Sequence, residues 1–202
     1  YYGLMWAIAI LVAVKFFDNF VKREGLKPEI SESIFLYGTI GTILGARLGH
    51  CLFYDPGYYL AQPWTILTEF RDGGMASHGA AIGILVGLWL FSRKNRLPYI
   101  WSLDRIMIGV AIGGAAVRLG NLFNSEIYGD VTNLPWGFIF ELRGETEPKH
   151  PTQLYEALSY FLLGVFQILM YKYRLPKLHR GFFIGTFFIG CFGSRFLIEF
   201  IK

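Results

Sequence analysis

The sequence predicts an all-α integral membrane protein built as a polytopic helical bundle. Of its 202 residues 53% are hydrophobic and 17% are charged, and the mean hydropathy is +0.40. This composition is too apolar for an ordinary soluble domain. Several apolar segments also approach the length of a membrane span. Because lipid offers no partner to exposed backbone groups, we expect these segments to be helices.

Six segments are long and apolar enough to be read as membrane spans, each of which needs about 20 residues. They are residues 1–17, 33–54, 75–91, 104–123, 152–171 and 181–200. The first and third segments are short, and both can extend into the adjoining residues of the chain. Glycines recur at four-residue spacing, as in Gly41, Gly45 and Gly49, which permits close helix contact. We expect residues 1–202 to form one transmembrane domain.

The basic residues of the connections predict the orientation. Ten fall in the first, third and fifth connections: Lys22, Arg23, Lys27, Arg93, Lys94, Arg96, Lys172, Arg174, Lys177 and Arg180. Only three fall in the second and fourth: Arg71, Arg143 and Lys149. Basic loops stay in the cytoplasm, so the N-terminus is expected outside. The net charge of +4 thus indicates membrane topology and not nucleic-acid binding.

Two segments are expected on the outer side. Residues 55–70 are aromatic and apolar but too short to span, and are typical of a segment lying in the membrane interface. Residues 124–151 should form a small extracytoplasmic cap with turns and a weakly alternating strand at 138–142. Cys51 and Cys191 lie in apolar stretches and are expected to be packing residues.

Polar residues gather at the predicted outer ends of the spans. They are Tyr2, Arg47, His78, Arg118, His150, Arg195 and Glu199. An arginine in hydrocarbon costs a few kcal/mol at least and usually marks a function. One such arginine could equally be a structural residue whose charge reaches the interface. Agreement among six separate segments favours a functional cluster.

The cluster has the chemistry of a phosphate site. Arg118 and Asn121 are three residues apart and share a helix face. Arginine binds phosphate through two hydrogen bonds and keeps its charge when partly buried, which predicts a clamp for an anionic lipid. The sequence has no phosphate-binding glycine loop, no acidic pair with metal spacing and no serine-nucleophile motif. We therefore expect neither a metal nor a cofactor.

Several strings resemble the prolipoprotein diacylglyceryl transferase family. "RLGNLFNSEIYG" (118–129) and "HPTQLYEAL" (150–158) are the specific ones. "YYGLM" (1–5), "GARLGHCLFY" (45–54), "GGMASHGAAIG" (73–83) and "RFLIEF" (195–200) follow the family's order. Ser125 and Cys191 depart from the commoner pattern, which has glycine and tyrosine there. The resemblance covers nearly the whole chain.

The resemblance implies a bacterial inner-membrane enzyme of seven helices with its N-terminus outside. The six spans would be the first six, with the seventh beyond Lys202. The enzyme would move the diacylglyceryl group of phosphatidylglycerol to the lipobox cysteine of a preprolipoprotein signal peptide, forming a thioether and releasing glycerol phosphate. Its active site would face the periplasmic leaflet.

The resemblance also implies roles for the polar residues. Arg118 and Arg195 would stabilise the charge that develops on the leaving phosphate. His78 would act as general base or only orient the headgroup. Asn121, Asn124 and Glu126 would hold the glycerol hydroxyls or the arginine. The remaining substrate-binding candidates are Tyr2, Gly129 and Glu199, together with Arg47 and His150, which could instead form ion pairs or cap loops. Asp104 and Arg105, at the cytoplasmic end, should anchor their helix.

Three other classes of function remain open from the residues alone. A transporter also places polar residues in a glycine-rich bundle, although here the charges do not reach the midplane. The other two classes are an enzyme acting on a different lipid headgroup and a non-catalytic lipid-binding scaffold.

Overall fold

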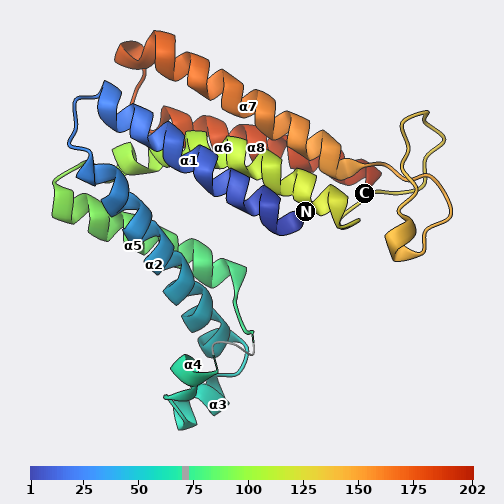
Figure 1. Ribbon diagram of the computed structural model, residues 1–202, viewed down its shortest axis with the longest axis horizontal. Coiled ribbons are helices and arrows are strands. Elements are labelled where there is room, and N and C mark those ends of the chain that lie inside the picture. The colour runs from blue at the N-terminus through green and yellow to red at the C-terminus, as the bar shows by residue number, and fades with distance from the viewer. Residues whose placement is uncertain (70–72) are drawn as a thin grey trace. The chain divides into compact units, whose positions relative to one another are not determined.

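A computed structural model describes residues 1–69 and 73–202 and shows an all-α architecture (Figure 1). Arg71, which was counted in the second connection, and the last residue of the 55–70 segment lie outside the described residues. The chain divides into two compact units. The first contains Tyr1–Phe20 and Leu103–Lys202, and the second contains Val21–Ser102. We describe each unit by itself.

The first unit contains four long helices that pack through small residues. They are α1 (Tyr2–Arg23, up to residue 20), α6 (Tyr99–Phe123, from residue 103), α7 (Thr152–Arg174) and α8 (Phe182–Ile198). Short 3-10 turns follow α7 and α8, at η3 (Leu175–Lys177) and η4 (Glu199–Ile201). A Cβ built on Gly109 would lie 3.2 Å from Ala13 of α1, and one on Gly164 would clash with the Ile112 side chain of α6. Small residues therefore set the spacing of these helices.

The second unit is built on the pair α2 (Glu29–Phe53) and α5 (Ser77–Asn95). Their glycines face one another so closely that a Cβ on Gly45 would lie 2.6 Å from the Cα of Gly83. A Cβ on Gly49 would meet the Cα of Gly79 at the same distance. The close contact expected from the glycine spacing is confirmed. Two short helices, α3 (Pro56–Ala61) and α4 (Thr65–Thr68), follow α2.

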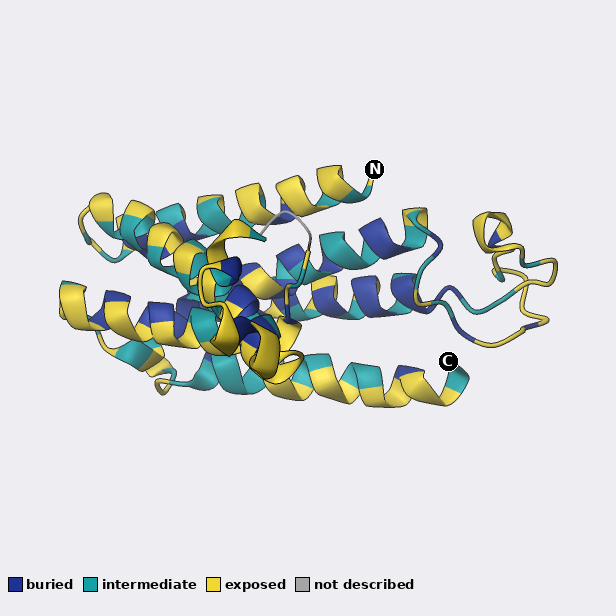
Figure 2. Ribbon diagram, turned by 90° about the horizontal axis from the view of Figure 1, so that it is seen from below, coloured by how far each residue is buried: buried dark blue, intermediate teal, exposed yellow. Residues whose placement is uncertain are grey.

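The helices have the surface of a membrane protein. Four of the described helical segments are long and apolar enough to cross a bilayer: Tyr2–Arg23, Tyr99–Phe123, Thr152–Lys177 and Phe182–Ile201. Exposed residues, many of them large and apolar, run along the long helices (Figure 2). The protein is an all-α polytopic membrane protein. α2 and α5 coincide with two predicted spans but fall outside the group of four, so the six-span count stays a prediction.

The segment between α6 and α7 has less regular structure than expected. Within the described residues it has isolated antiparallel bridges, Val131 with Lys149 and Phe138 with Lys149, and no strand. The alternation at 138–142 therefore led to a wrong expectation. The chain turns directly after Phe140 into the 3-10 helix η2 (Glu141–Arg143), which ends at Gly144 with a φ of 74°. A strand cannot continue through that turn.

Asp104 anchors two helices of the first unit to each other. It is 3% exposed, and its carboxylate accepts hydrogen bonds from the backbone N–H groups of Gly181 (2.8 Å) and Ile184 (3.0 Å). These are N–H groups at the start of α8, which have no partner inside the helix. Arg105 beside it lies over the ring of Tyr171 at 5.2 Å. The anchoring role expected for this pair of residues agrees with these contacts.

Candidate functional site

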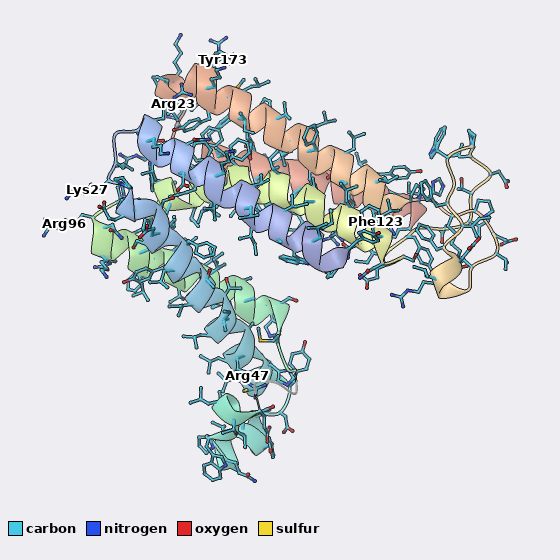
Figure 3. The ribbon with its side chains drawn as sticks, in the orientation of Figure 1. Arg23, Lys27, Arg47, Arg96, Phe123 and Tyr173 are labelled. Carbon is cyan, nitrogen blue, oxygen red and sulfur yellow. The ribbon has the colours of Figure 1, made fainter. Side chains whose placement is uncertain are left out.

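The candidate site of the first unit forms where four helix ends meet. The start of α1 lies against the end of α6, because a Cβ on Gly120 would come within 2.9 Å of the Tyr2 ring. The Tyr1 and Phe123 rings are also close, with centroids 5.7 Å apart. Phe123 marks this end of α6 in Figure 3, beside the loop that leads toward α7. The backbone N–H of Asp130 reaches the carbonyl of Ile201 at 3.1 Å, which brings in the residues after α8.

Arg118 forms a largely buried ion pair across two helices. Its Nε lies 2.5 Å from Oε2 of Glu156 on α7, and the side chains are 16% and 2% exposed. This is a contact between charges and not a well-directed hydrogen bond. Oε1 of Glu156 lies 3.7 Å from Nζ of Lys202, so one carboxylate faces two cations. In water-poor surroundings, loss of one partner of such a pair leaves the other charge without compensation.

The amides near Arg118 hold a second carboxylate. Nη1 of Arg118 donates to Oδ1 of Asn121 at 3.4 Å, which confirms that the two share a face. Nδ2 of Asn121 in turn donates to Glu126 at 3.1 Å, and Nδ2 of Asn124 does so at 3.4 Å. Arg143 of the cap lies 3.6 Å from the same carboxylate. Glu126 therefore links the end of α6 to the cap.

Gly129 and His150 fix the path of the chain below the cap. The N–H of Gly129 donates to the carbonyl of His150 at 2.9 Å, and the N–H of His150 donates to Asp130 at 2.9 Å. A Cβ on Gly129 would meet the Ile201 carbonyl and come within 2.8 Å of Thr152. Only glycine fits this crossing. The His150 ring lies 3.2 Å from the Tyr155 hydroxyl, a contact typical of a loop-capping role.

A shallow cavity opens beside this cluster. It has a volume of about 480 Å³ and is lined by Ser125, Glu126, Ile127, Tyr128 and Arg143. Beside it the Tyr128 hydroxyl donates to Glu145 at 2.7 Å, and Lys149 lies 3.1 Å from the same carboxylate. The hydrogen bond from Tyr128, helped by Lys149, lowers the pKa of Glu145. The same hydrogen bond raises the pKa of Tyr128.

Arg195 and Glu199 lie at the end of α8 without joining the Arg118 ion pair. Arg195 is half-buried and, in the part of the chain that is described, forms no hydrogen bond or ion pair with Arg118 or Glu156. The side chain of Glu199 is 64% exposed and lies 3.6 Å from Lys202. The second cation on the buried carboxylate is thus Lys202, which the sequence did not single out.

In the second unit Arg47 holds a loop. It is 2% exposed, and Figure 3 shows it beside α3 and α4. Its guanidinium donates to four backbone carbonyls, those of Ile66 (2.8 Å), Thr65 (3.0 Å), Gly73 (3.0 Å) and Gly74 (3.4 Å). It also lies 5.2 Å from the centre of the Tyr59 ring. Of the roles expected for Arg47, which were substrate binding, an ion pair and loop capping, these contacts favour loop capping.

His78 is exposed at the start of α5 and is bracketed by aromatic rings. The Phe53 ring meets it edge-on with centroids 4.9 Å apart, and the Tyr54 ring lies at 5.9 Å. Such packing limits the rotation of the imidazole. Among the described residues no group of three His, Cys, Asp or Glu side chains has the arrangement of a metal site.

Comparison with known proteins identifies the family. The sequence profile of the family described as prolipoprotein diacylglyceryl transferase matches residues 1–202. The chain is 42% identical over 213 residues to the phosphatidylglycerol–prolipoprotein diacylglyceryl transferase of Bacteroides fragilis, with 100% of this chain and 76% of that protein covered. The proteins of the same name from Porphyromonas gingivalis and Tolumonas auensis are 44% and 41% identical, with all of this chain and 75% and 78% of the relatives covered. The chain therefore belongs to the prolipoprotein diacylglyceryl transferase family.

Proposed function

We propose that this bacterial membrane protein transfers the diacylglyceryl group of phosphatidylglycerol to a prolipoprotein, at the lipobox cysteine of its signal peptide. The family match over residues 1–202 carries this proposal. The cluster around Arg118 supports it, because a largely buried arginine beside the Asn121 amide suits a lipid phosphate. The reaction would be the first step of bacterial lipoprotein maturation.

The reaction forms one carbon–sulfur bond and breaks one carbon–oxygen bond. The cysteine thiol loses its proton to a base, and its sulfur attacks the glyceryl carbon bound to the phosphate. The electron pair of the broken bond leaves with the phosphate oxygen, so glycerol phosphate gains one negative charge. A site that lowers the barrier must hold cationic donors where this charge develops.

Arg118 is the residue best prepared for that task. Nε faces Glu156 and Nη1 faces Asn121. We propose that the guanidinium held by these two contacts also binds the substrate phosphate. A guanidinium already held in place loses little freedom when the charge appears. We propose Arg195 as a second cation, with Asn121, Asn124, Glu126, Gly129, Tyr2 and Glu199 forming the rest of the binding site.

The remaining roles are proposed on sequence grounds. His78 takes the thiol proton or orients the headgroup, and the pH profile of a His78→Gln variant separates the two. If His78 is the general base, His78→Gln loses the acidic limb of the rate profile. If His78 only orients the headgroup, His78→Gln raises KM and keeps that limb. Arg47 and His150 are further substrate-binding candidates, with loop capping as the alternative role. We further propose that the protein lies in the inner membrane with the Arg118 end toward the periplasmic leaflet, as the basic loops indicate.

A direct test uses purified full chain, phosphatidylglycerol vesicles and a lipobox peptide. Mass spectrometry should show the peptide gaining one diacylglyceryl group. Arg118→Ala should abolish this gain because the charge is removed. Arg118→Lys should abolish it too, because lysine cannot form the bidentate contact with phosphate. Arg105→Lys, at the other end of the same helix, serves as the matched control and should keep the activity.

The same experiment addresses the competing functions. Unmodified peptide together with lipid flux across vesicles would favour a transporter. Unmodified peptide with another lipid product would favour a different headgroup enzyme, and bound but unchanged lipid would favour a scaffold. Near-normal transfer by Arg118→Ala would remove this arginine from the mechanism.

A further inference from the structure

The loop that follows α6 contains two residues in the left-handed backbone region. Ser125 has a φ of 53° and Ile127 a φ of 59°. Ser125 has a local reason, since it ends α6 in a turn in which the N–H of Glu126 reaches the carbonyl of Asn121 at 2.9 Å. Ile127 has no such reason. A β-branched residue with positive φ is an outlier that its surroundings must impose.

The surroundings do impose it, because each of three consecutive carbonyls is held by a side chain. Nε of Arg143 donates to Ser125 at 3.2 Å. Nε2 of Gln153 donates to the carbonyl of Glu126 at 2.6 Å, and Oγ1 of Thr152 donates to that of Ile127 at 2.8 Å. Thr152 and Gln153 are 0% and 1% exposed. Both lie in the first turn of α7, a rigid element, so they fix the loop to the start of this helix.

The held loop determines where the Glu126 carboxylate points. Glu126 lies between the two strained residues, and its carboxylate accepts from Asn121 and Asn124. If Ile127 relaxed to negative φ, the peptide unit between Glu126 and Ile127 would rotate, and the Glu126 side chain would be carried away from this position. Its link to Arg118 through Asn121 would then be lost.

We infer that Thr152 and Gln153 are positioning residues of the transfer reaction, which hold Glu126 and, through it, the Arg118 end of the site. The inference rests on the proposed function. Both side chains act on the loop backbone through its carbonyls. Their hydrogen bonds to loop carbonyls keep a conformation that the loop sequence alone disfavours.

The test is a double-mutant cycle with Ile127→Gly, since glycine adopts positive φ without strain. Thr152→Val, which keeps the shape and loses the hydroxyl, should lower kcat/KM for phosphatidylglycerol about tenfold, comparable to the loss of one positioning hydrogen bond. In the Ile127→Gly background the same change should cost less than about twofold. Gln153→Leu should behave alike, and Thr152→Ser should keep the activity.

Gln167→Leu is the matched control. Gln167 is on the same helix, is 0% exposed and donates Nε2 to the carbonyl of Phe183 at 2.7 Å, but it is far along the helix from the loop. Its replacement should leave kcat/KM unchanged. An equal loss for Gln167→Leu and Gln153→Leu, or an equal effect of Thr152→Val in both backgrounds, would overturn the inference.

Folding does not obscure the result. If Thr152→Val gives no folded protein, the yield of folded protein becomes the readout, and Ile127→Gly must restore it for the inference to hold. If the wild-type chain does not transfer lipid, the proposed function fails, while the same cycle in thermal stability still decides whether Thr152 holds a strained loop.

Discussion

Removing the charge of Glu156 by the substitution Glu156→Gln should destabilise the fold strongly. The carboxylate is 2% exposed and faces Arg118 at 2.5 Å and Lys202 at 3.7 Å. Breaking a buried ion pair by removing one partner costs about 3–5 kcal/mol, because the other charge is left without compensation. Arg118 keeps 16% exposure and can recover part of its hydration. We therefore expect a loss of about 3 kcal/mol, at the lower end of that range.

Equilibrium unfolding in detergent micelles measures this loss. Glu199→Gln is the matched control, because Glu199 also lies near Lys202, at 3.6 Å, but with 64% exposure of its side chain. An exposed pair contributes about 0–1 kcal/mol, so the control should change little. In the double variant Arg118→Gln/Glu156→Gln the effects should be far from additive. Equal effects of the two glutamate variants, or additivity in the cycle, would refute the assignment of a buried charge pair.

Three further predictions follow from the contacts described above. Arg47→Lys should lower stability by about 2 kcal/mol and speed proteolysis within residues 55–69, because an ammonium cannot reach four separate carbonyls; unchanged cleavage would count against loop capping. Ser125→Gly should raise stability by about 1 kcal/mol in a thermal melt, because Ser125 has a φ of 53°; a lower melting temperature would contradict this. Tyr128→Phe should lower the melting temperature only at pH values between the titration of Glu145 and that of Tyr128. Because the pKa of Glu145 is lowered in the fold, its stabilisation is complete above the pKa of the unfolded carboxyl and is lost as pH falls through the folded value. Because the pKa of Tyr128 is raised in the fold, its stabilisation is complete below the pKa of the unfolded phenol and is lost as pH rises through the folded value. The melting curves of the two proteins should therefore converge at acidic and at alkaline pH, and a constant difference at every pH would rule out the coupling.

Local spacing predicted the parts of the fold that depend on one helix or on repeated small residues. The glycines of α2 and α5 indicated a close pair, and the structure shows backbone meeting backbone. Arg118 and Asn121 were expected on one face because they are three residues apart, and they are in contact. The all-α membrane architecture followed from composition and segment length in the same way.

Contacts between distant segments could not be predicted in this way. Glu156 stands in a string that the resemblance singled out, yet its pairing with Arg118 depends on how α6 and α7 pack. Arg143 reaches the loop after α6 only because η2 turns the cap back. The expected strand at 138–142 failed for the same reason, since weak alternation does not show where a chain reverses direction.

The backbone contact between α2 and α5 has a consequence for motion. Helices that meet through long side chains can slide when those side chains change rotamer. At the glycines of α2 and α5 the backbone carbonyls and α-carbons meet directly, so there are no side chains to change rotamer. We therefore expect the two helices to move as one body. Arg47, in the last third of α2, and His78, at the start of α5, would then keep a constant distance from each other.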